Sequence, residues 1–413
     1  MYESASHLRE AIKAPNFEKN TLNRDGNWTA LEDFSEGLPD RRDPPPVMIH
    51  PSGSRFNVDK KQKFVSWMGF EFFMTTSSDT AVALHDVKFN GDSVMFELGL
   101  QETFVTYASD DPKQGGQDFL DSGLLMGFTM VELVPGYDCP AYATFLSTEY
   151  HVEGVTIARK NSICIFEYTS DYALQRHTSA DQVSISRNTY LIVRFVSTVG
   201  NYDYTFDYAF YLDGTIEVKV RASGFIFGLF WNENTSPQNE YGYRIHDAAA
   251  TSIHDHVLNF KADLDVVGTS NTMVRVGIEP MTKEFPWDDK ETTPRNTMHL
   301  VPRTVEKETG INWAPNSAEM LLILNENVTN AWGEKRGYRI QPGPGIGTPA
   351  HRTVANSTSS GVAAEWATKD LWVLKRKDTE PKSSTIFNAF NPSNPLVDFS
   401  KFVDDENIVD DDL

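Results

Sequence analysis

Basic residues are scarce in this chain of 413 residues, which carries 37 Lys and Arg against 58 Asp and Glu. The formal net charge of −21 argues against nucleic acid as a partner, because binding to phosphates relies on concentrated positive charge. It would suit a cationic substrate, although most of these carboxylates are expected on a solvated surface. Long apolar runs are also missing, since no stretch approaches the 18 residues of a membrane span.

Cysteine is nearly absent, with only Cys139 and Cys164. The spacing of these two cysteines is equally compatible with one disulfide and with two buried free thiols. No secretory signal is visible, because the first residues contain neither a basic region nor an apolar one. The protein is therefore either intracellular or begins inside a longer precursor. Four tripeptides match N-glycosylation sequons, at Asn27, Asn234, Asn327 and Asn356. They fit a secreted protein but are common by chance.

What the chain does contain, from Ser54 onward, is a strong β signal. Short segments of alternating or aromatic-rich sequence are separated by turn residues, among them the two-residue hairpin turn Asp213-Gly214. The segments predicted as strands are 64–73, 81–89, 93–100, 189–196, 204–212, 215–220, 320–324 and 369–376. Many short strands without alternating helices predict a mainly β fold, a large antiparallel β-sandwich of two packed sheets.

The sequence predicts one large domain, residues 46–413, after a leader and linker over residues 1–45. The leader would begin with a short helix, residues 6–13, with Ser6 as its N-cap. Residues 16–46 are polar, irregular and end in three prolines, which is typical of a linker. The final stretch, 403–413, is acidic and without context would be typical of a disordered tail.

Two short motifs carry residues suited to redox chemistry. The first is Thr198-Val-Gly-Asn-Tyr-Asp-Tyr204, and the second is Thr251-Ser-Ile-His-Asp-His256. Histidines at i and i+2 of a strand project from the same face, so two imidazoles could share a metal. With 10 histidines in 413 residues, chance alone produces roughly 0.24 such pairs per chain, so the pair by itself decides nothing. Imidazole ligands suit copper, zinc or iron equally.

Together the two motifs resemble those of the copper-containing primary amine oxidases. In that family the tyrosine of a Thr-x-x-Asn-Tyr-Asp/Glu-Tyr motif becomes the quinone cofactor topaquinone, and a later His-x-His binds copper. The resemblance implies that Tyr202 is the cofactor precursor and that His254 and His256 are copper ligands. It also implies that Asn201 and Asp203, which flank the tyrosine, orient its ring.

Two upstream elements extend the resemblance, Tyr107-Ala-Ser-Asp-Asp-Pro112 and Phe119-Leu-Asp-Ser-Gly123. They make Asp121 the catalytic base, a role for which a buried carboxylate with a raised pKa is suited. Tyr107 would then hydrogen-bond the quinone, and Phe119 would line the substrate channel. Without the resemblance, an Asp before Ser-Gly is more often a turn residue. The segment 124–135 departs from the family pattern, which leaves the substrate open.

The resemblance implies two further features. Cys139 and Cys164 fall where relatives keep a disulfide. A second site, for a hard cation of the calcium type, is implied by a set of oxygen ligands. That set is Asp263, Leu264, Asp265, Asp412 and Leu413. A solvated acidic turn and tail is the alternative for these residues.

The implied activity is the oxidation of primary amines by O2 to aldehyde, ammonia and hydrogen peroxide. The implied protein is secreted, has copper, topaquinone and calcium as cofactors, and forms a homodimer in its full-length form. In relatives a third histidine binds the copper after the stretch matching 406–413, whereas His299 and His351 are the only histidines after His256 here. We therefore expect a copper site with two histidines and an inactive chain. The alternative is a non-catalytic β-sandwich kept for metal binding or dimer assembly.

Overall fold

The computed structural model describes residues 3–17, 19, 46–109, 114, 117–152, 154–231, 240–287, 294–343 and 360–413. Most of the predicted linker lies outside the described residues. So do Asp110, Asp111 and Pro112 of the first upstream element, His351, and the sequons at Asn27, Asn234 and Asn356.

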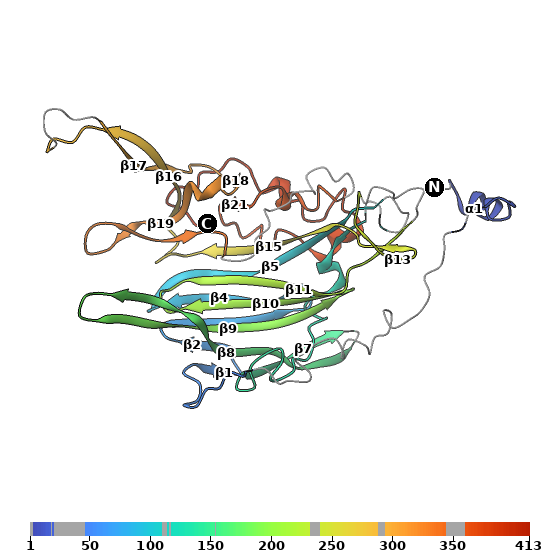
Figure 1. The fold of residues 1–413 in the computed structure, drawn as a ribbon, viewed down its shortest axis with the longest axis horizontal. Helices are drawn as coiled ribbons and strands as arrows, with labels where there is room; N and C mark the ends of the chain where they lie inside the picture. The colour runs from blue at the N-terminus through green and yellow to red at the C-terminus, as the bar shows by residue number, and fades with distance from the viewer. Residues whose placement is uncertain are drawn as a thin grey trace.

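Two large antiparallel sheets form the body of the protein (Figure 1). The first has the order β1-β2-β3-β4-β5-β15, with β6 also paired to β5. Its strands are β1 (Asn57–Asp59), β2 (Phe64–Trp67), β3 (Phe70–Ser77), β4 (Ala81–Phe89), β5 (Asp92–Tyr107), β6 (Asp118–Leu120) and β15 (His254–Leu264). The second has the order β11-β10-β9-β8-β7. Its strands are β7 (Thr144–Val152), β8 (Val155–Thr178), β9 (Val183–Val199), β10 (Tyr202–Tyr211) and β11 (Ile216–Gly224).

The main core lies between these two sheets and is rich in aromatic rings. Strand β3 alternates buried and exposed residues over most of its length, as one face of a sandwich requires. Phe72 of β3 stacks on Phe210 of β10 at a centroid distance of 4.5 Å, and Phe195 of β9 stacks on Phe206 at 4.7 Å. The predicted antiparallel β-sandwich is therefore confirmed.

Strand β5 differs from β3, because every residue from Leu98 to Val105 is buried. One face belongs to the main core, and the other is covered by short 3-10 turns from the end of the chain. Phe104 of β5, for example, packs in one cluster with Trp366 and Phe399. The covering cluster includes residues of η6 (Glu365–Thr368) and η8 (Phe399–Lys401), and the described chain also contains η3 (Asp121–Leu124), η4 (Pro315–Ser317) and η7 (Ile386–Phe390). A polar side chain on the covered face of β5 is consequently removed from water.

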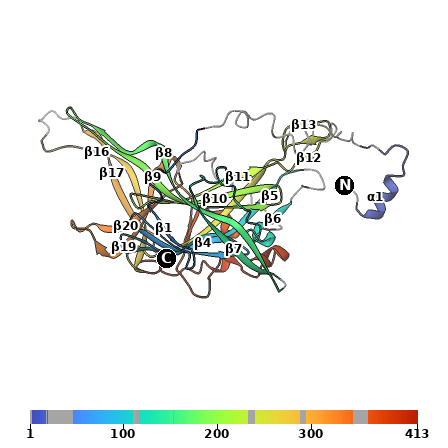
Figure 2. The same ribbon diagram turned by 90° about the horizontal axis from the view of Figure 1, so that it is seen from below.

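Three smaller sheets complete the described fold. The four-stranded sheet has the order β17-β16-β19-β20 and contains β16 (Asn271–Lys283), β17 (Arg295–Thr304), β19 (Glu319–Thr329) and β20 (Lys335–Ile340). The other two contain β12 (Leu229–Phe230), β13 (Arg244–His246) and β14 (Ala249–Ala250), and β18 (Thr309–Ile311) with β21 (Leu371–Val373). Two long hairpins, β8–β9 and β16–β17, project on the same side of the molecule (Figures 1 and 2). No described helix is long and apolar enough to cross a membrane.

The structure corrects several predicted boundaries. The helix, α1, spans Ala5–Ala11, and its N-cap is Ser4, whose hydroxyl accepts from the His7 amide at 3.1 Å, in place of Ser6. The segment 64–73 is two strands, because Met68 and Gly69 adopt positive φ and turn the chain. Strand β5 is longer than predicted, and β21 is shorter. The hairpin after β10 uses residues 212–215, with the Tyr211 amide donating to the Thr215 carbonyl at 2.9 Å.

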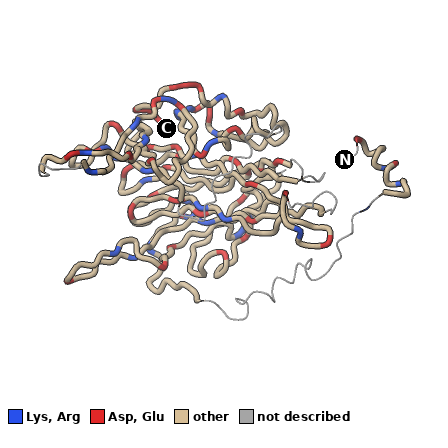
Figure 3. Tube along the Cα trace, turned by 45° about the horizontal axis from the view of Figure 1, so that its top comes forward, with Lys and Arg blue, Asp and Glu red and all other residues tan. Residues whose placement is uncertain are grey.

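The acidic ending is ordered. Asp411 and Asn271 exchange two backbone hydrogen bonds, at 2.9 and 3.0 Å, and Ile408 is fully buried. Lys377 faces the carboxylates of Asp404 and Glu406, both at 3.0 Å, which offsets their mutual repulsion. The disordered tail predicted from composition is therefore wrong, because a sheet edge and a lysine elsewhere in the chain provide partners. Elsewhere in the described chain, acidic and basic residues are interspersed over strands and loops (Figure 3).

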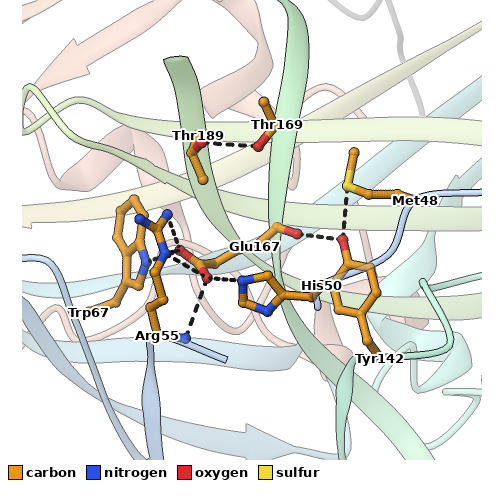
Figure 4. A network of polar contacts seen from close by, with 8 residues as sticks. All are labelled: Met48, His50, Arg55, Trp67, Tyr142, Glu167, Thr169 and Thr189. Carbon is orange, nitrogen blue, oxygen red and sulfur yellow. Dashed lines mark hydrogen bonds and ion pairs between the residues drawn. The ribbon is translucent and has the colours of Figure 1, made fainter. Parts of the chain in front are cut away.

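A buried carboxylate, Glu167 of β8, ties the entering chain to both large sheets (Figure 4). Its oxygens accept from the Nη2 of Arg55 at 2.6 Å and from the Nε1 of Trp67, on β2, at 2.8 Å. Burial by itself raises the pKa of Glu167, but hydrogen bonds from Arg55 and Trp67 outweigh burial and lower it. The Tyr142 hydroxyl donates to the Glu167 carbonyl at 2.7 Å. These contacts hold residues 50–55, which precede β1, against the sandwich.

Candidate active site

The tyrosine and histidine motifs meet although they lie in different sheets. Tyr202 begins β10 of the five-stranded sheet, and His254 and His256 begin β15 of the seven-stranded sheet. The Tyr202 hydroxyl is hydrogen-bonded to Nε2 of His254. The Tyr202 ring packs edge-on against His256 at a centroid distance of 4.7 Å, and the two imidazoles are 5.0 Å apart. One phenol therefore faces two imidazoles from the same strand face.

The hydrogen bonds of the two histidines favour metal binding through Nε2. Nδ1 of His254 donates to the Ser252 carbonyl at 2.8 Å, so its Nε2 keeps a lone pair. Nδ1 of His256 lies 2.6 Å from the Tyr204 hydroxyl, and its Nε2 is buried without a hydrogen-bond partner. Burial and the neighbouring His254 lower the pKa of His256 to about 4, so that imidazole is neutral at pH 7. An orphaned buried nitrogen beside a second imidazole fits a copper ion.

Asp121 lies on the other side of Tyr204, in the turn η3 that follows β6. Its side chain is 3 % exposed, and the Tyr204 hydroxyl donates to its Oδ2 at 3.3 Å. Burial first, and then the negative charge of Glu102, raise the pKa of Asp121 to about 7, while the bond from Tyr204 opposes the rise. A carboxylate with a pKa near 7 can accept a proton at neutral pH and release it again.

Tyr107, the last residue of β5, stands opposite His254 in the strand register. Their rings stack at a centroid distance of 4.9 Å, and the edge of Phe119 lies 6.0 Å from Tyr107. Burial and the charges of Tyr202 and Asp121 raise the pKa of Tyr107 to about 12, so its hydroxyl stays protonated. Phe119 is more than a third exposed, and together with Leu124 and Phe390 it lines a pocket of about 180 Å³ next to the turn of Asp121.

Asn201 and Asp203 shape the turn that presents Tyr202. The Asn201 side chain donates to the Phe225 carbonyl at 2.6 Å, and its own carbonyl accepts from the Phe225 amide at 3.1 Å. The Asp203 carboxylate accepts from the Thr198 hydroxyl at 2.5 Å across the β9–β10 hairpin. Gly200 supplies the positive φ that this tight turn requires. Both side chains therefore hold the backbone on either side of the tyrosine.

Three of the residues predicted for a second site lie together at the far end of β15. Oxygen atoms of Asp263, Asp265 and Asp412 lie within 4.8 Å of one another, and one oxygen of each is buried without a hydrogen bond. Burial is the largest cause of the raised pKa of all three carboxyls, and Asp263 reaches about 6. The Leu264 amide donates to the Leu413 carbonyl at 2.8 Å. Three carboxylates that each keep one buried oxygen without a hydrogen bond fit a hard cation.

The structure also shows where the two cysteines and His299 lie. Cys139 and Cys164 form a disulfide, with Cα atoms 6.6 Å apart, so the disulfide is confirmed. His299 lies on β17 of the four-stranded sheet, paired with Glu279, and His351 lies outside the described residues.

Sequence reasoning missed three residues of the site, namely Tyr204, Ser252 and Glu102. Tyr204 links Asp121 to His256, and the Ser252 carbonyl fixes the tautomer of His254. A signal for Tyr204 existed, because residues i and i+2 of a strand share a face and Tyr202 was already assigned. No local signal marks Glu102, since its burial depends on distant parts of the chain.

Comparisons with known proteins agree with this geometry. The family model described as copper amine oxidase, enzyme domain, matches residues 57–413. Copper amine oxidase vicK1 of Bipolaris victoriae is 40 % identical over 411 residues, which cover 98 % of this chain and 57 % of that protein. The primary amine oxidase, liver isozyme, of Bos taurus is 30 % identical over 419 residues, covering 100 % and 53 %. The chain spans about half the length of the curated relatives it matches.

Solved structures give the same result. The crystal structure of Aspergillus nidulans amine oxidase superimposes with a TM-score of 0.91 at 42 % identity, covering 100 % of this chain and 55 % of that one. The crystal structure of Pichia pastoris lysyl oxidase gives 0.90 at 39 % identity, covering 100 % and 56 %. On the match to the family model and on these relatives, the chain belongs to the copper amine oxidases and carries their enzyme domain.

Proposed function

We propose that the protein oxidises primary amines with O2 and water to aldehyde, ammonia and hydrogen peroxide, using copper and a topaquinone formed from Tyr202. The observation that carries the proposal is the position of the Tyr202 hydroxyl. It is hydrogen-bonded to His254, and the Tyr202 ring packs against His256, whose buried Nε2 has no hydrogen-bond partner. A scaffold without chemistry would have no need of a buried, unpaired imidazole nitrogen next to a carboxylate with a pKa of about 7.

Each residue has a distinct part in this proposal. His254 and His256 hold the copper, and Tyr107 packs on His254 and positions the cofactor ring. Asp121 removes a proton from the carbon next to the amine nitrogen, for which its raised pKa is suited. When bound, the metal and the quinone supply the two-electron oxidation of the amine and the reduction of O2. The buried environment of Asp121 and Tyr204 keeps bulk water from the transferred proton.

Two substitutions in the native, copper-loaded protein test the proposal. Tyr202→Phe should remove the quinone absorbance entirely, because no phenol remains to be oxidised. Asp121→Asn should retain that absorbance but lose more than 99 % of amine oxidation, about the 10²-fold or more that a general base contributes. Peroxide release from benzylamine measures the activity, and absorbance measures the cofactor. Undiminished turnover by Asp121→Asn would refute the role of the base.

We further propose calcium as the ion of the second site, on the strength of its three carboxylates. We propose domain limits at residues 1–45 and 46–413. A secreted protein is supported by the disulfide, which persists in oxidising compartments. Two free thiols titrating in the unreduced folded protein would count against secretion.

A homodimer is proposed from the two projecting hairpins. Near the tip of the β8–β9 hairpin, Tyr172, Val183 and Ile185 are more than half exposed, as are Met298 and Leu300 on β17. Apolar side chains on paired arms are typical of surfaces that a second subunit covers.

A further inference from the structure

A second buried carboxylate lies next to the turn of Asp121, and the chemistry described so far does not use it. Glu102 of β5 is 0 % exposed. Its Oε1 accepts from the amides of Thr103 at 3.0 Å and Ser122 at 2.8 Å. Its Oε2 accepts from the hydroxyls of Ser122 at 2.5 Å and Ser384 at 2.8 Å. Among the described residues, no Lys, Arg or His forms an ion pair with it.

This pattern of donors favours an ionised carboxylate without a counter-charge. The two amides can only donate, so both occupy Oε1, and each hydroxyl is placed to donate to Oε2. Burial is the largest influence and raises the pKa of Glu102 on balance, while the bonds from Ser122, Ser384 and Thr103 oppose the rise. Hydrogen bonds can retain a charge in an interior that would otherwise neutralise it.

The bonds of Glu102 also fix the turn that carries Asp121. Ser122 is the next residue along the chain, and it contributes both its amide and its hydroxyl. On the other side, Ser384 precedes η7, and a Cβ on Gly123 would lie 3.0 Å from the Cβ of Ala389 in that turn. The turns η3 and η7 are therefore packed against each other and both anchored to β5. The Asp121 carboxylate has little freedom to move away from Tyr204.

We propose that Glu102 is a positioning residue for Asp121, which holds the turn of the base in place and maintains a second buried negative charge beside it. The inference rests on the proposed role of Asp121. A neighbouring negative charge makes a carboxylate a stronger base, because the proton it accepts is stabilised by both charges. Groups on two elements face Asp121: Glu102 and Tyr107 on β5, and Tyr204 on β10.

Three substitutions separate the charge from the geometry. Glu102→Gln keeps the shape, because its amide oxygen can still accept from the two backbone amides and its NH2 can donate to the two hydroxyls. Glu102→Asp keeps the charge but is one methylene too short to span Ser122 and Ser384. Ser384→Ala removes one of the four hydrogen bonds to Glu102 and leaves both bonds from Ser122, the neighbour of Asp121, in place, so it serves as the matched control.

The pH dependence of kcat/KM for benzylamine, measured with the native copper-loaded protein, distinguishes these variants. In Glu102→Gln, the acidic limb of this profile, which reports the protonation of Asp121, should move to lower pH by about one unit, because the neighbouring negative charge is lost. Glu102→Asp should leave the limb in place and reduce kcat by about tenfold to a hundredfold, because the base is misplaced. Ser384→Ala should retain the wild-type limb. An unmoved limb in Glu102→Gln, or full activity in Glu102→Asp, would overturn the proposal.

A second measurement does not depend on turnover. In metal-free protein, the infrared carbonyl band of the protonated Asp121 carboxyl can be identified by its loss in Asp121→Asn. Its titration midpoint should be lower in Glu102→Gln than in wild type by about the same unit. Equal midpoints would overturn the inference, whatever the activity. If the wild-type protein oxidises no amine but the midpoint shifts, the proposed function fails while the electrostatic coupling of Glu102 to Asp121 stands.

Discussion

Each imidazole of the proposed copper site has its second nitrogen engaged by a specific neighbour. His254 donates to a backbone carbonyl, and His256 contacts the Tyr204 hydroxyl, which also donates to Asp121. Such partners fix the ring orientation and the tautomer of a ligand, so that the free nitrogen points at the metal. A single buried tyrosine thereby couples the geometry of the metal ligand to that of the base.

Replacing Tyr204 tests this coupling directly. Tyr204→Phe should weaken copper binding by about 10- to 100-fold, because the ring of His256 loses the partner that orients it. Competition with a chromophoric copper chelator measures the affinity. Tyr208→Phe is the matched control, since Tyr208 lies on the same strand but donates to the Val82 carbonyl at 2.9 Å. The control should bind copper normally, and an unchanged affinity in Tyr204→Phe would contradict the coupling.

At the scale of elements, strand β15 connects two sites. His254 and His256 lie at its beginning. Asp263, near its end, and Asp265, just after it, belong to the carboxylate cluster, which lies roughly 25 Å away along the strand. The cluster is completed by Asp412, so an ion there would join β15 to the end of the described chain. Without a cation the three carboxylates repel one another, although Lys261 and Arg376 lie within 3.9 Å of Asp263.

Adding and removing calcium should therefore change stability. At a free calcium concentration 100 times its Kd, bound ion stabilises the folded state by about 2.7 kcal/mol. We expect calcium to raise the thermal unfolding midpoint of the wild-type protein and to have no such effect on Asp412→Asn. The control is Asp410→Asn, because Asp410 is exposed and contacts Asn327. Equal stabilisation of Asp412→Asn and wild type would argue against this site.

At the scale of the whole molecule, the hairpins β8–β9 and β16–β17 project on the same side (Figure 2). Leaving their apolar side chains exposed to water costs about 25 cal/mol for each Å² of apolar surface. A second subunit would cover them, and stable interfaces commonly bury 1,200 to about 2,000 Å² in total.

Charged substitutions on one hairpin test the homodimer. The double variant Tyr172→Asp with Ile185→Asp places two charges in the proposed interface and should convert the protein to a monomer. Light scattering coupled to gel filtration measures the mass. Tyr137→Asp, at a loop position that is 90 % exposed and belongs to neither hairpin, should leave the mass unchanged. A double variant with wild-type mass would exclude this hairpin from the interface.

Local sequence was sufficient for the type of fold, whereas the roles expected for the reactive groups came from the resemblance of their motifs to those of a known family. Alternation along segments such as 81–89 depends only on neighbouring residues, and so does the i, i+2 placement of His254 and His256. The boundaries of elements were less well predicted where a turn needed a positive φ, as at Met68. They were also less well predicted where two nearby serines, Ser4 and Ser6, could each serve as the helix N-cap.

The sequence by itself determined the antiparallel sandwich and the resemblance to the copper amine oxidases, in which Tyr202, His254, His256 and Asp121 stand at the motif positions. Only the tertiary structure decided what surrounds these groups. The burial of Glu102 requires Ser384, which is 282 positions away, and the order of the acidic ending requires Asn271 and Lys377. Desolvation and charge coupling depend on which distant segments pack together, and no local pattern encodes that packing.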